Sequence, residues 1–297
     1  MQDLGYVTIV TIEHYADRRN EKMGLFEVNV FNDTRKKYGT IYKAETEELV
    51  NNGTRIYIDP IVDTQFMPHQ KMPNKNMKVW VEKNGTVSAG KAFTKGRTAI
   101  LNFADALVPG GLVLTGATTQ EENICRCSNL YAALTSPETN REYYCYNALA
   151  DAKNDLYPTE WRPGVYTDAL IYTRDVLFYK DDNNYEDVEP YRMDVITCPA
   201  PSVKIKPELL EKTVIRSRLE KIVKAAILNK VDNLVLGAWG CGAFGQDPEL
   251  ISKTFMEVIK IYSAFDNVVF ALRGCDPVFE TGVEDENYKA FLDNCKL

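Results

Sequence analysis

The chain carries two different spacings of hydrophobic residues from about residue 97 onward, and their alternation predicts strands that alternate with helices. Short apolar runs predict buried strands at 98–103, 165–179, 191–198, 233–239 and 268–272. Apolar positions that recur every three or four residues predict helices at 119–134, from Pro207 to about Ile227, and from Asp247 to about 263, with a short helix near the end of the chain. This alternation favours a three-layer α/β fold.

The first 95 residues have a less regular pattern. Turn signals stand at Asn51-Asn52-Gly53 and Asn84-Gly85, and residues 67–78 are rich in Pro, Met and Lys. We therefore expect an N-terminal extension, 1–95, packed on a core domain, 96–297. Within the core domain, the acidic and polar residues 180–190 predict a solvated loop.

Composition narrows the class of protein. The chain is 45% hydrophobic and 26% charged, with a formal net charge of −7, which argues against a general nucleic-acid or membrane-headgroup binder. No apolar run reaches the roughly 18 residues of a membrane span, and the start lacks a basic and apolar signal, so we expect a cytoplasmic protein. Seven cysteines, an odd number, indicate reduced thiols, and with only two histidines a metal site is not expected.

A first candidate site lies between Pro109 and Glu122, where a glycine loop follows the strand at 98–103. Adjacent carboxylates, Glu121 and Glu122, stand at the start of the next helix. A glycine loop lets backbone N–H groups approach a ligand, so this combination suggests a hydrolase for a phosphorylated substrate. The same residues also satisfy the capping-box pattern from Thr119 to Glu122, which requires no catalysis.

A second glycine loop, Gly237 to Phe244, follows the strand at 233–239 and can present several backbone amides to a diphosphate. It contains the dinucleotide pattern Gly240-x-Gly242-x-x-Gly245, but only about one βα unit follows it, which does not fit a full nicotinamide-binding half-domain. A purely structural turn is the alternative. If both glycine loops follow parallel strands, they converge at one edge of the sheet, where α/β folds bind ligands. Phe244 is then a candidate to stack on a ribose or base, or else a core residue.

Together these segments resemble the bacterial-type poly(ADP-ribose) glycohydrolases. The family signature is three glycines, a spacer of six to eight residues and Gln-Glu-Glu; this chain has Gly110-Gly111-Leu112, seven residues, and Gln120-Glu121-Glu122. Further matching segments follow in order at 101–104, 123–131, 165–166, 173–176, 194–201 and 236–244. The resemblance covers roughly residues 97–272 and matches the first 95 poorly. It implies a macrodomain: a three-layer mixed sheet flanked by helices, with an N-terminal extension.

The resemblance also implies roles for single residues. Glu122 would be the catalytic acid/base, Glu121 would hold a ribose hydroxyl, and Gln120 would orient the pair. Asn102 and Asp105 would line the site beside the ribose. The remaining expected substrate contacts come from the two glycine loops: Gly110, Gly111 and Leu112 in the first, and Gly237, Gly240, Cys241, Gly242, Ala243 and Phe244 in the second.

The activity implied is hydrolysis of the O-glycosidic ribose–ribose bond of poly(ADP-ribose), without metal or cofactor. Expected partners are ADP-ribose or its polymer, and ADP-ribosylated proteins. One departure stands out: the third glycine is Leu112, which could narrow the pocket, change substrate choice or weaken activity. The alternatives are therefore a macrodomain that binds ADP-ribose without cleaving it, and a hydrolase of a different ADP-ribosylated substrate. A nicotinamide-dependent oxidoreductase is the least favoured.

Overall fold

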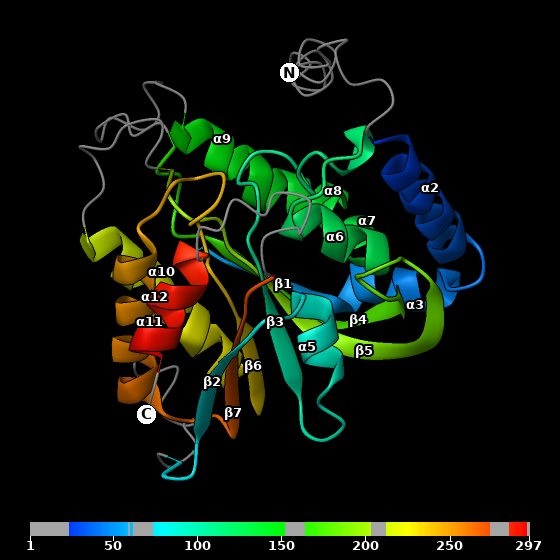
Figure 1. Ribbon diagram of the computed structural model, residues 1–297. Helices are drawn as coiled ribbons and strands as arrows, with labels where there is room; N and C mark the ends of the chain where they lie inside the picture. Colours follow the sequence, from blue (N-terminus) through cyan, green and yellow to red (C-terminus); the bar gives the residue numbers. More distant parts are fainter. Residues whose placement is uncertain are drawn as a thin grey trace.

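The computed structural model describes residues 24–58, 60–61, 74–151, 164–202, 212–273 and 285–295. Within these segments a seven-stranded mixed sheet forms the middle layer (Figure 1). The central strands β3, β6 and β7 run parallel, β5 joins them beside β3, and β2 beside β7, while β4 pairs antiparallel with β5 and β1 with β4. In spatial order the strands are β1 (Thr54–Tyr57), β4 (Leu170–Lys180), β5 (Asp187–Thr197), β3 (Thr98–Asn102), β6 (Asn233–Leu236), β7 (Asn267–Ala271) and β2 (Lys78–Glu82).

Helices cover both faces of this sheet (Figure 1). One face carries α10 (Lys212–Leu228), α11 (Pro248–Tyr262) and α12 (Glu286–Asn294). The other carries α2 (Leu25–Gly39), α3 (Lys43–Glu48), the π-helix η1 (Leu49–Gly53), α5 (Thr86–Lys91), α6 (Gln120–Cys127) and α7 (Leu130–Leu134), and next to these come α8 (Pro137–Thr139), η4 (Asn140–Tyr144) and α9 (Cys145–Asp151). The three-layer α/β prediction is confirmed.

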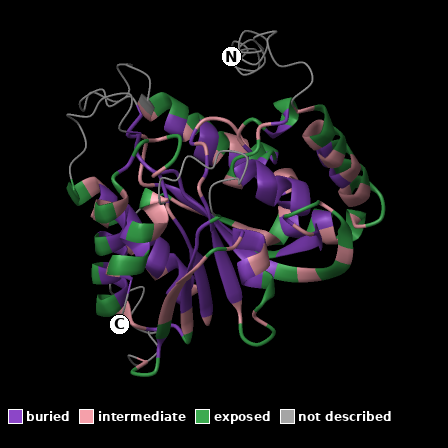
Figure 2. Ribbon diagram, viewed as in Figure 1, coloured by how far each residue is buried: buried purple, intermediate pink, exposed green. Residues whose placement is uncertain are grey.

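The sheet separates two hydrophobic cores. Along β3 the side chains of Ala99 and Leu101 enter the core under α10 and α11, and Ile100, which points the other way, enters the core under α5 and α6. All three are completely buried. Figure 2 shows this burial along the central strands. Burial on both faces explains why the strand at 98–103 reads as a continuous apolar run.

One predicted helix is in fact two. The segment 119–134 forms α6 and α7, with a break at Ser128 and Asn129. Ser128 has an extended backbone and bridges to Phe178 of β4, and Asn129 exchanges hydrogen bonds with Leu177 through its N–H and its side-chain oxygen. These bonds to the sheet replace the helical ones, so the apolar spacing continues through a point where the helix ends.

The predicted solvated loop at 180–190 is also shorter than expected. Strand β5 begins at Asp187, and Asp182, within the loop, is only 1% exposed. The expected start of a helix at Pro207 lies outside the described residues, and α10 is described from Lys212. By contrast, the Asp247-Pro248 start of α11 is confirmed, since the Asp247 carboxylate accepts the backbone N–H of Glu249.

Segment 1–95 supplies the two edge strands of the sheet, β1 and β2, together with α2, α3 and α5. Its division from 96–297 as a separate extension stays a prediction. Across the described segments no helix combines the length and apolar character needed to cross a bilayer. The six cysteines in those segments are free thiols.

Candidate functional site

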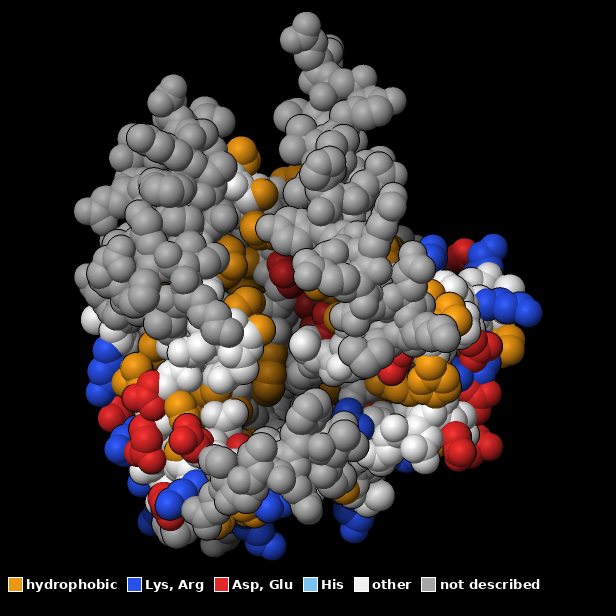
Figure 3. Space-filling view, turned by 45° about the horizontal axis from the view of Figure 1, so that its top comes forward, with side chains coloured by type: hydrophobic (Ala, Val, Ile, Leu, Met, Phe, Trp, Pro, Cys, Tyr) orange, Lys and Arg blue, Asp and Glu red, His pale blue; other side chains and the backbone are white. Residues whose placement is uncertain are grey.

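A cavity of about 500 Å³ opens where β3, β6 and β7 end. Both glycine loops line it, the first through Gly111 and Leu112 and the second through Gly240, Gly242 and Ala243. The predicted convergence of the two loops is therefore confirmed. In the space-filling view, acidic side chains lie recessed in a hollow of this face (Figure 3).

The adjacent carboxylates Glu121 and Glu122 lie on the first turn of α6 and line the cavity, although they are only 3% and 4% exposed. Glu122 Oε1 accepts the backbone N–H of Leu112 at 2.8 Å, and its Oε2 accepts the hydroxyl of Thr119. Glu121 Oε2 accepts the backbone N–H of Asp105 at 2.7 Å, and its Oε1 accepts the amide of Asn102 at 3.2 Å. Each acid is thus fixed in position by two donors.

These contacts argue against the capping-box alternative. Thr119 is the N-cap residue of α6, but its side chain accepts no hydrogen bond from the helix backbone. Its hydroxyl donates to Glu122 instead. Neither carboxylate accepts a backbone N–H from its own helix; both accept a backbone N–H from a preceding loop, Leu112 for Glu122 and Asp105 for Glu121, and both remain at the cavity wall.

Burial changes the electrostatics of Glu121 and of Asp105 beside it. Burial raises the pKa of Glu121 well above its ordinary value, and the charges of Asp105 and Glu122 act in the same direction, against the donors Asp105 N–H and Asn102. Burial also raises the pKa of Asp105, although the N–H groups of Leu107 and Val108 oppose the rise. Burial and the neighbouring negative charges therefore favour the protonated form of Glu121.

The two glycines of the first loop are required for different structural reasons. Gly110 and Gly111 both have left-handed backbones, with φ of +70° and +59°. A Cβ at Gly111 would lie 2.4 Å from Glu122 Oε1, and one at Gly110 would lie 2.7 Å from the ring of Tyr131. Gly110 does not line the cavity, so it is a packing requirement, while Gly111 keeps the acid where it is.

Leu112 needs no left-handed backbone, because its φ is −98°. Its side chain is 53% exposed and lines the cavity. The departure from the three-glycine signature therefore introduces no backbone strain and leaves the N–H that Glu122 accepts in place.

Of Gln120 and Asn102, only Asn102 forms a hydrogen bond with one of the acids, Glu121. Gln120 accepts the N–H of Phe103 at 2.9 Å and donates to the carbonyl of Leu101 at 2.7 Å, so it joins the end of β3 to the start of α6. Asn102 is fully buried and does not line the cavity, and its amide bonds both Glu121 and Thr197. Of the two residues predicted beside the ribose, only Asp105 reaches the cavity.

In the second loop, too, some residues line the cavity and others are needed for packing. Gly242 has nothing within 4 Å of an added Cβ, so it faces open space in the cavity. Gly240 has a φ of +78°, and its added Cβ would lie 2.6 Å from Ala200. Gly237 and Cys241 do not line the cavity; a Cβ at Gly237 would lie 2.7 Å from the carbonyl oxygen of Ala271.

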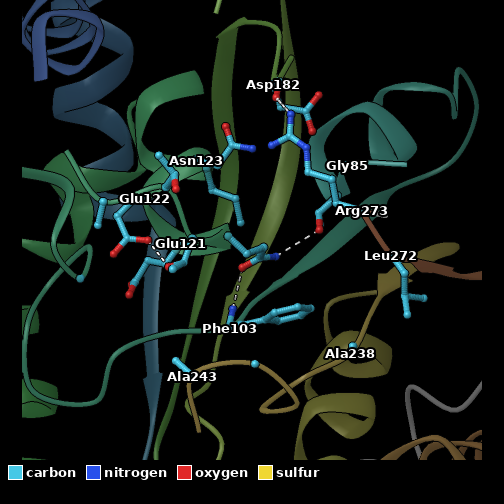
Figure 4. A pocket seen from close by; sticks show the side chains of 18 of the residues that line it. Gly85, Phe103, Glu121, Glu122, Asn123, Asp182, Ala238, Ala243, Leu272 and Arg273 are labelled. Carbon is cyan, nitrogen blue, oxygen red and sulfur yellow. Dashed lines mark hydrogen bonds between the residues drawn. The ribbon is translucent and has the colours of Figure 1, made fainter. Parts of the chain in front are cut away.

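The sequence did not predict the opposite wall. Figure 4 shows Asp182 and Arg273 across the cavity from Glu121 and Glu122. The Asp182 carboxylate accepts the backbone N–H of Ser88 at 3.3 Å and also the Ser88 hydroxyl. The backbone carbonyl of Asp182 accepts a hydrogen bond from the Arg273 guanidinium. A Cβ at Gly85 would lie 2.0 Å from the Asp182 carboxylate, so this wall requires glycine in the Asn84-Gly85 turn.

Arg273 is the only Lys or Arg among the described residues that line the cavity. An anionic ligand must therefore be held mainly by backbone N–H groups, as in the anion-binding loops of other α/β proteins. Within the described segments, no cluster of three or more His, Cys, Asp or Glu side chains could hold a metal ion.

Comparison with known proteins shows the family of this chain. The family described as the catalytic domain of microbial-type PARG matches residues 14–181, a range that includes most of segment 1–95. No curated protein matched the chain.

Solved structures give the same result over more of the chain. Poly(ADP-ribose) glycohydrolase from Thermomonospora curvata is 27% identical with a TM-score of 0.75, covering 90% of this chain and 98% of that one. The same enzyme bound to the inhibitor ADP-HPD gives a TM-score of 0.72, with 27% identity over 89% of this chain and 97% of that one. Poly(ADP-ribose) glycohydrolase from Deinococcus radiodurans in complex with ADP-ribose is 30% identical with a TM-score of 0.70, covering 82% and 95%. The chain belongs to the family of microbial-type poly(ADP-ribose) glycohydrolase catalytic domains.

Proposed function

We propose that this protein binds ADP-ribose and hydrolyses the O-glycosidic ribose–ribose bond of poly(ADP-ribose), with Glu122 as the acid/base. The observation that carries the proposal is the fixing of Glu122 at the cavity wall by Leu112 N–H and the Thr119 hydroxyl. A protein that only held ADP-ribose would have no need of a buried acid pair at its cavity wall, since burying carboxylates is unfavourable.

Glu122 first acts as an acid. Its carboxyl proton passes to the ribose oxygen that leaves as the bond to the anomeric carbon breaks, and an oxocarbenium-like centre forms. The Thr119 hydroxyl can bond Glu122 in either state, because a hydroxyl donates to a carboxylate and accepts from a carboxylic acid. The support for Glu122 therefore persists through the proton transfer.

Glu122 then acts as a base. Water adds its oxygen to the anomeric carbon, and the proton it loses returns to the Glu122 carboxylate, which restores the starting state. Glu121 neighbours Glu122 on one helix turn, so the two do not face each other across the scissile bond as the carboxylates of most glycosidases do. We assign Glu121 to holding a ribose hydroxyl, without a covalent intermediate.

We assign the diphosphate to the second loop. Gly240, Gly242 and Ala243 line the cavity, and Gly242 leaves space for close approach of a ligand to the backbone. Phe244 lines the same wall, with its ring 6.5 Å from that of Tyr166, and we assign it to pack against the nucleotide. Asp105 lines the acid end beside Glu121.

The test is turnover of automodified poly(ADP-ribose), with free ADP-ribose measured for the wild type, Glu122→Gln and Glu257→Gln. Glu257 lies on α11 with a half-exposed side chain and serves as the matched control. We expect the Glu122 variant to lose activity by about two to four orders of magnitude, the usual contribution of a general acid/base. Full release by Glu122→Gln contradicts the assignment. Calorimetric binding of ADP-ribose with no release by the wild type would instead support the binding-only alternative.

A further inference from the structure

Arg126, on the last turn of α6, is a completely buried arginine. Among the described residues no carboxylate pairs with its guanidinium, and one of its nitrogens, Nη1, has no hydrogen-bond partner. The guanidinium instead lies 5.9 Å from the ring centre of Tyr185. Burial of a cation without a carboxylate partner is unfavourable. The buried Arg126 guanidinium therefore calls for an explanation in the other contacts that it makes.

The remaining guanidinium nitrogens join two distant parts of the chain. Nε donates to the carbonyl of Glu27 on α2 at 3.3 Å, and Nη2 donates to the carbonyl of Ala117. Ala117 belongs to the 112–119 loop, which lines the cavity and supplies both donors to Glu122. The backbone carbonyl of Arg126 in turn accepts the Thr34 hydroxyl of α2 at 2.6 Å. Arg126 therefore connects α2, α6 and the loop that fixes the acid.

The start of α2 touches the same loop at a second point. A Cβ on Gly116 would lie 2.5 Å from the carbonyl oxygen of Gly24, the residue just before α2. Gly116 has a φ of +84°. Such a close backbone approach leaves the 112–119 loop supported by α2 at one end and by Arg126 behind it.

We propose that Arg126 is a positioning residue that holds the 112–119 loop against α2 and α6, and thereby places Leu112 N–H and the Thr119 hydroxyl on Glu122. The inference rests on the proposed hydrolase function. It also gives part of segment 1–95 a role, because α2 supplies the carbonyl that completes the connection. A planar guanidinium can reach two carbonyls in different directions, whereas an ammonium acts from a single point.

The test compares Arg126→Lys with Arg97→Lys as the matched control. Arg97 is partly buried, and it pairs with Asp194 at the opposite end of β3 from the cavity. Both changes should lower the melting temperature. Kinetics with poly(ADP-ribose) and calorimetry with ADP-ribose are measured for each variant, and for the wild type.

For Arg126→Lys we expect kcat to fall about 100-fold, as for an ångström-scale displacement of a catalytic group, with KM and ADP-ribose affinity unchanged within about threefold. Arg97→Lys should keep the wild-type kcat. Arg126→Ala should regain part of its kcat in guanidinium chloride, against sodium chloride of equal concentration.

Wild-type kcat in Arg126→Lys, or an equal loss of kcat in Arg97→Lys, overturns the inference. Neither result bears on the proposed function, which fails separately: if the wild type releases no ADP-ribose, or if Glu122→Gln releases it at the full rate.

Discussion

The substitution Gly111→Ala should displace the Glu122 carboxylate and so lower activity, although Glu122 itself is unchanged. The added Cβ would lie 2.4 Å from Glu122 Oε1, and ordinary van der Waals contact begins near 3.4 Å, so the carboxylate must move by about 1 Å. The left-handed backbone at φ +59° adds a penalty of about 1–2 kcal/mol for a non-glycine residue. One substitution therefore affects both the acid and the fold.

The two effects can be separated by magnitude. A displacement of about 1 Å at a catalytic group lowers kcat by about 100-fold, which corresponds to about 2.7 kcal/mol in the activation barrier. The backbone penalty lowers the melting temperature by only a few degrees in a protein of this size. ADP-ribose affinity should change little, because the second loop is untouched.

The assay is release of ADP-ribose from polymer, beside thermal unfolding and ADP-ribose calorimetry. Gly39→Ala is the control, since Gly39 ends α2 and its added Cβ meets nothing within 4 Å. If Gly111→Ala keeps kcat within about threefold of the wild type while its melting temperature falls, the position of Glu122 does not limit turnover and the reasoning is refuted.

Three further outcomes follow from the same geometry. Gly242→Ala should keep the wild-type melting temperature, because its Cβ meets open space, but should weaken ADP-ribose binding in calorimetry; Gly237→Ala, whose Cβ would lie 2.7 Å from a carbonyl oxygen, should instead unfold more readily. Leu112→Gly should cost about 0.5–1 kcal/mol in the free energy of unfolding, from added freedom of the unfolded backbone, and should lower kcat far less than Gly111→Ala, because Leu112 N–H remains. The folded state raises the pKa of Glu121, so it holds a proton that the unfolded chain loses, and the free energy of unfolding should fall as pH rises from about 4.5 through the folded pKa. Denaturation across that range should show a shallower fall in Glu121→Gln, and an equal fall in both proteins would contradict the raised pKa.

The alternation of strands and helices could be predicted because the central strands are buried on both faces and the helices on one. That pattern is local and repeats along the chain. The break at Ser128 could not be predicted, since it depends on bonds to Phe178 and Leu177 about 50 residues later. Bonds of that kind leave no trace in the local apolar spacing.

The candidate site also has a part that could be predicted from the sequence and a part that could not. Each glycine loop is a short contiguous segment, so its place at the cavity could be predicted from composition and spacing. The opposite wall combines Gly85, Asp182 and Arg273, which are separated by about 90 residues at each step and belong to no shared motif. Only the packed sheet brings them together. The capping-box pattern was ambiguous for a related reason. Thr119 and Glu122 are three residues apart whether they cap the helix or fix the acid at the cavity, and their hydrogen bonds depend on where Leu112 lies.

The structure also changes the meaning of Leu112. In the three-glycine signature, the positions that require a left-handed backbone here are Gly110 and Gly111, and the third position has φ −98°. What the third residue must supply is its N–H, and any residue except proline supplies that. Leucine therefore leaves the acid in place and alters only the shape of the cavity wall next to it, with a half-exposed apolar side chain. A difference between this protein and relatives with three glycines should accordingly appear in which leaving groups fit beside Glu122, and the rate with a leaving group that fits should be preserved.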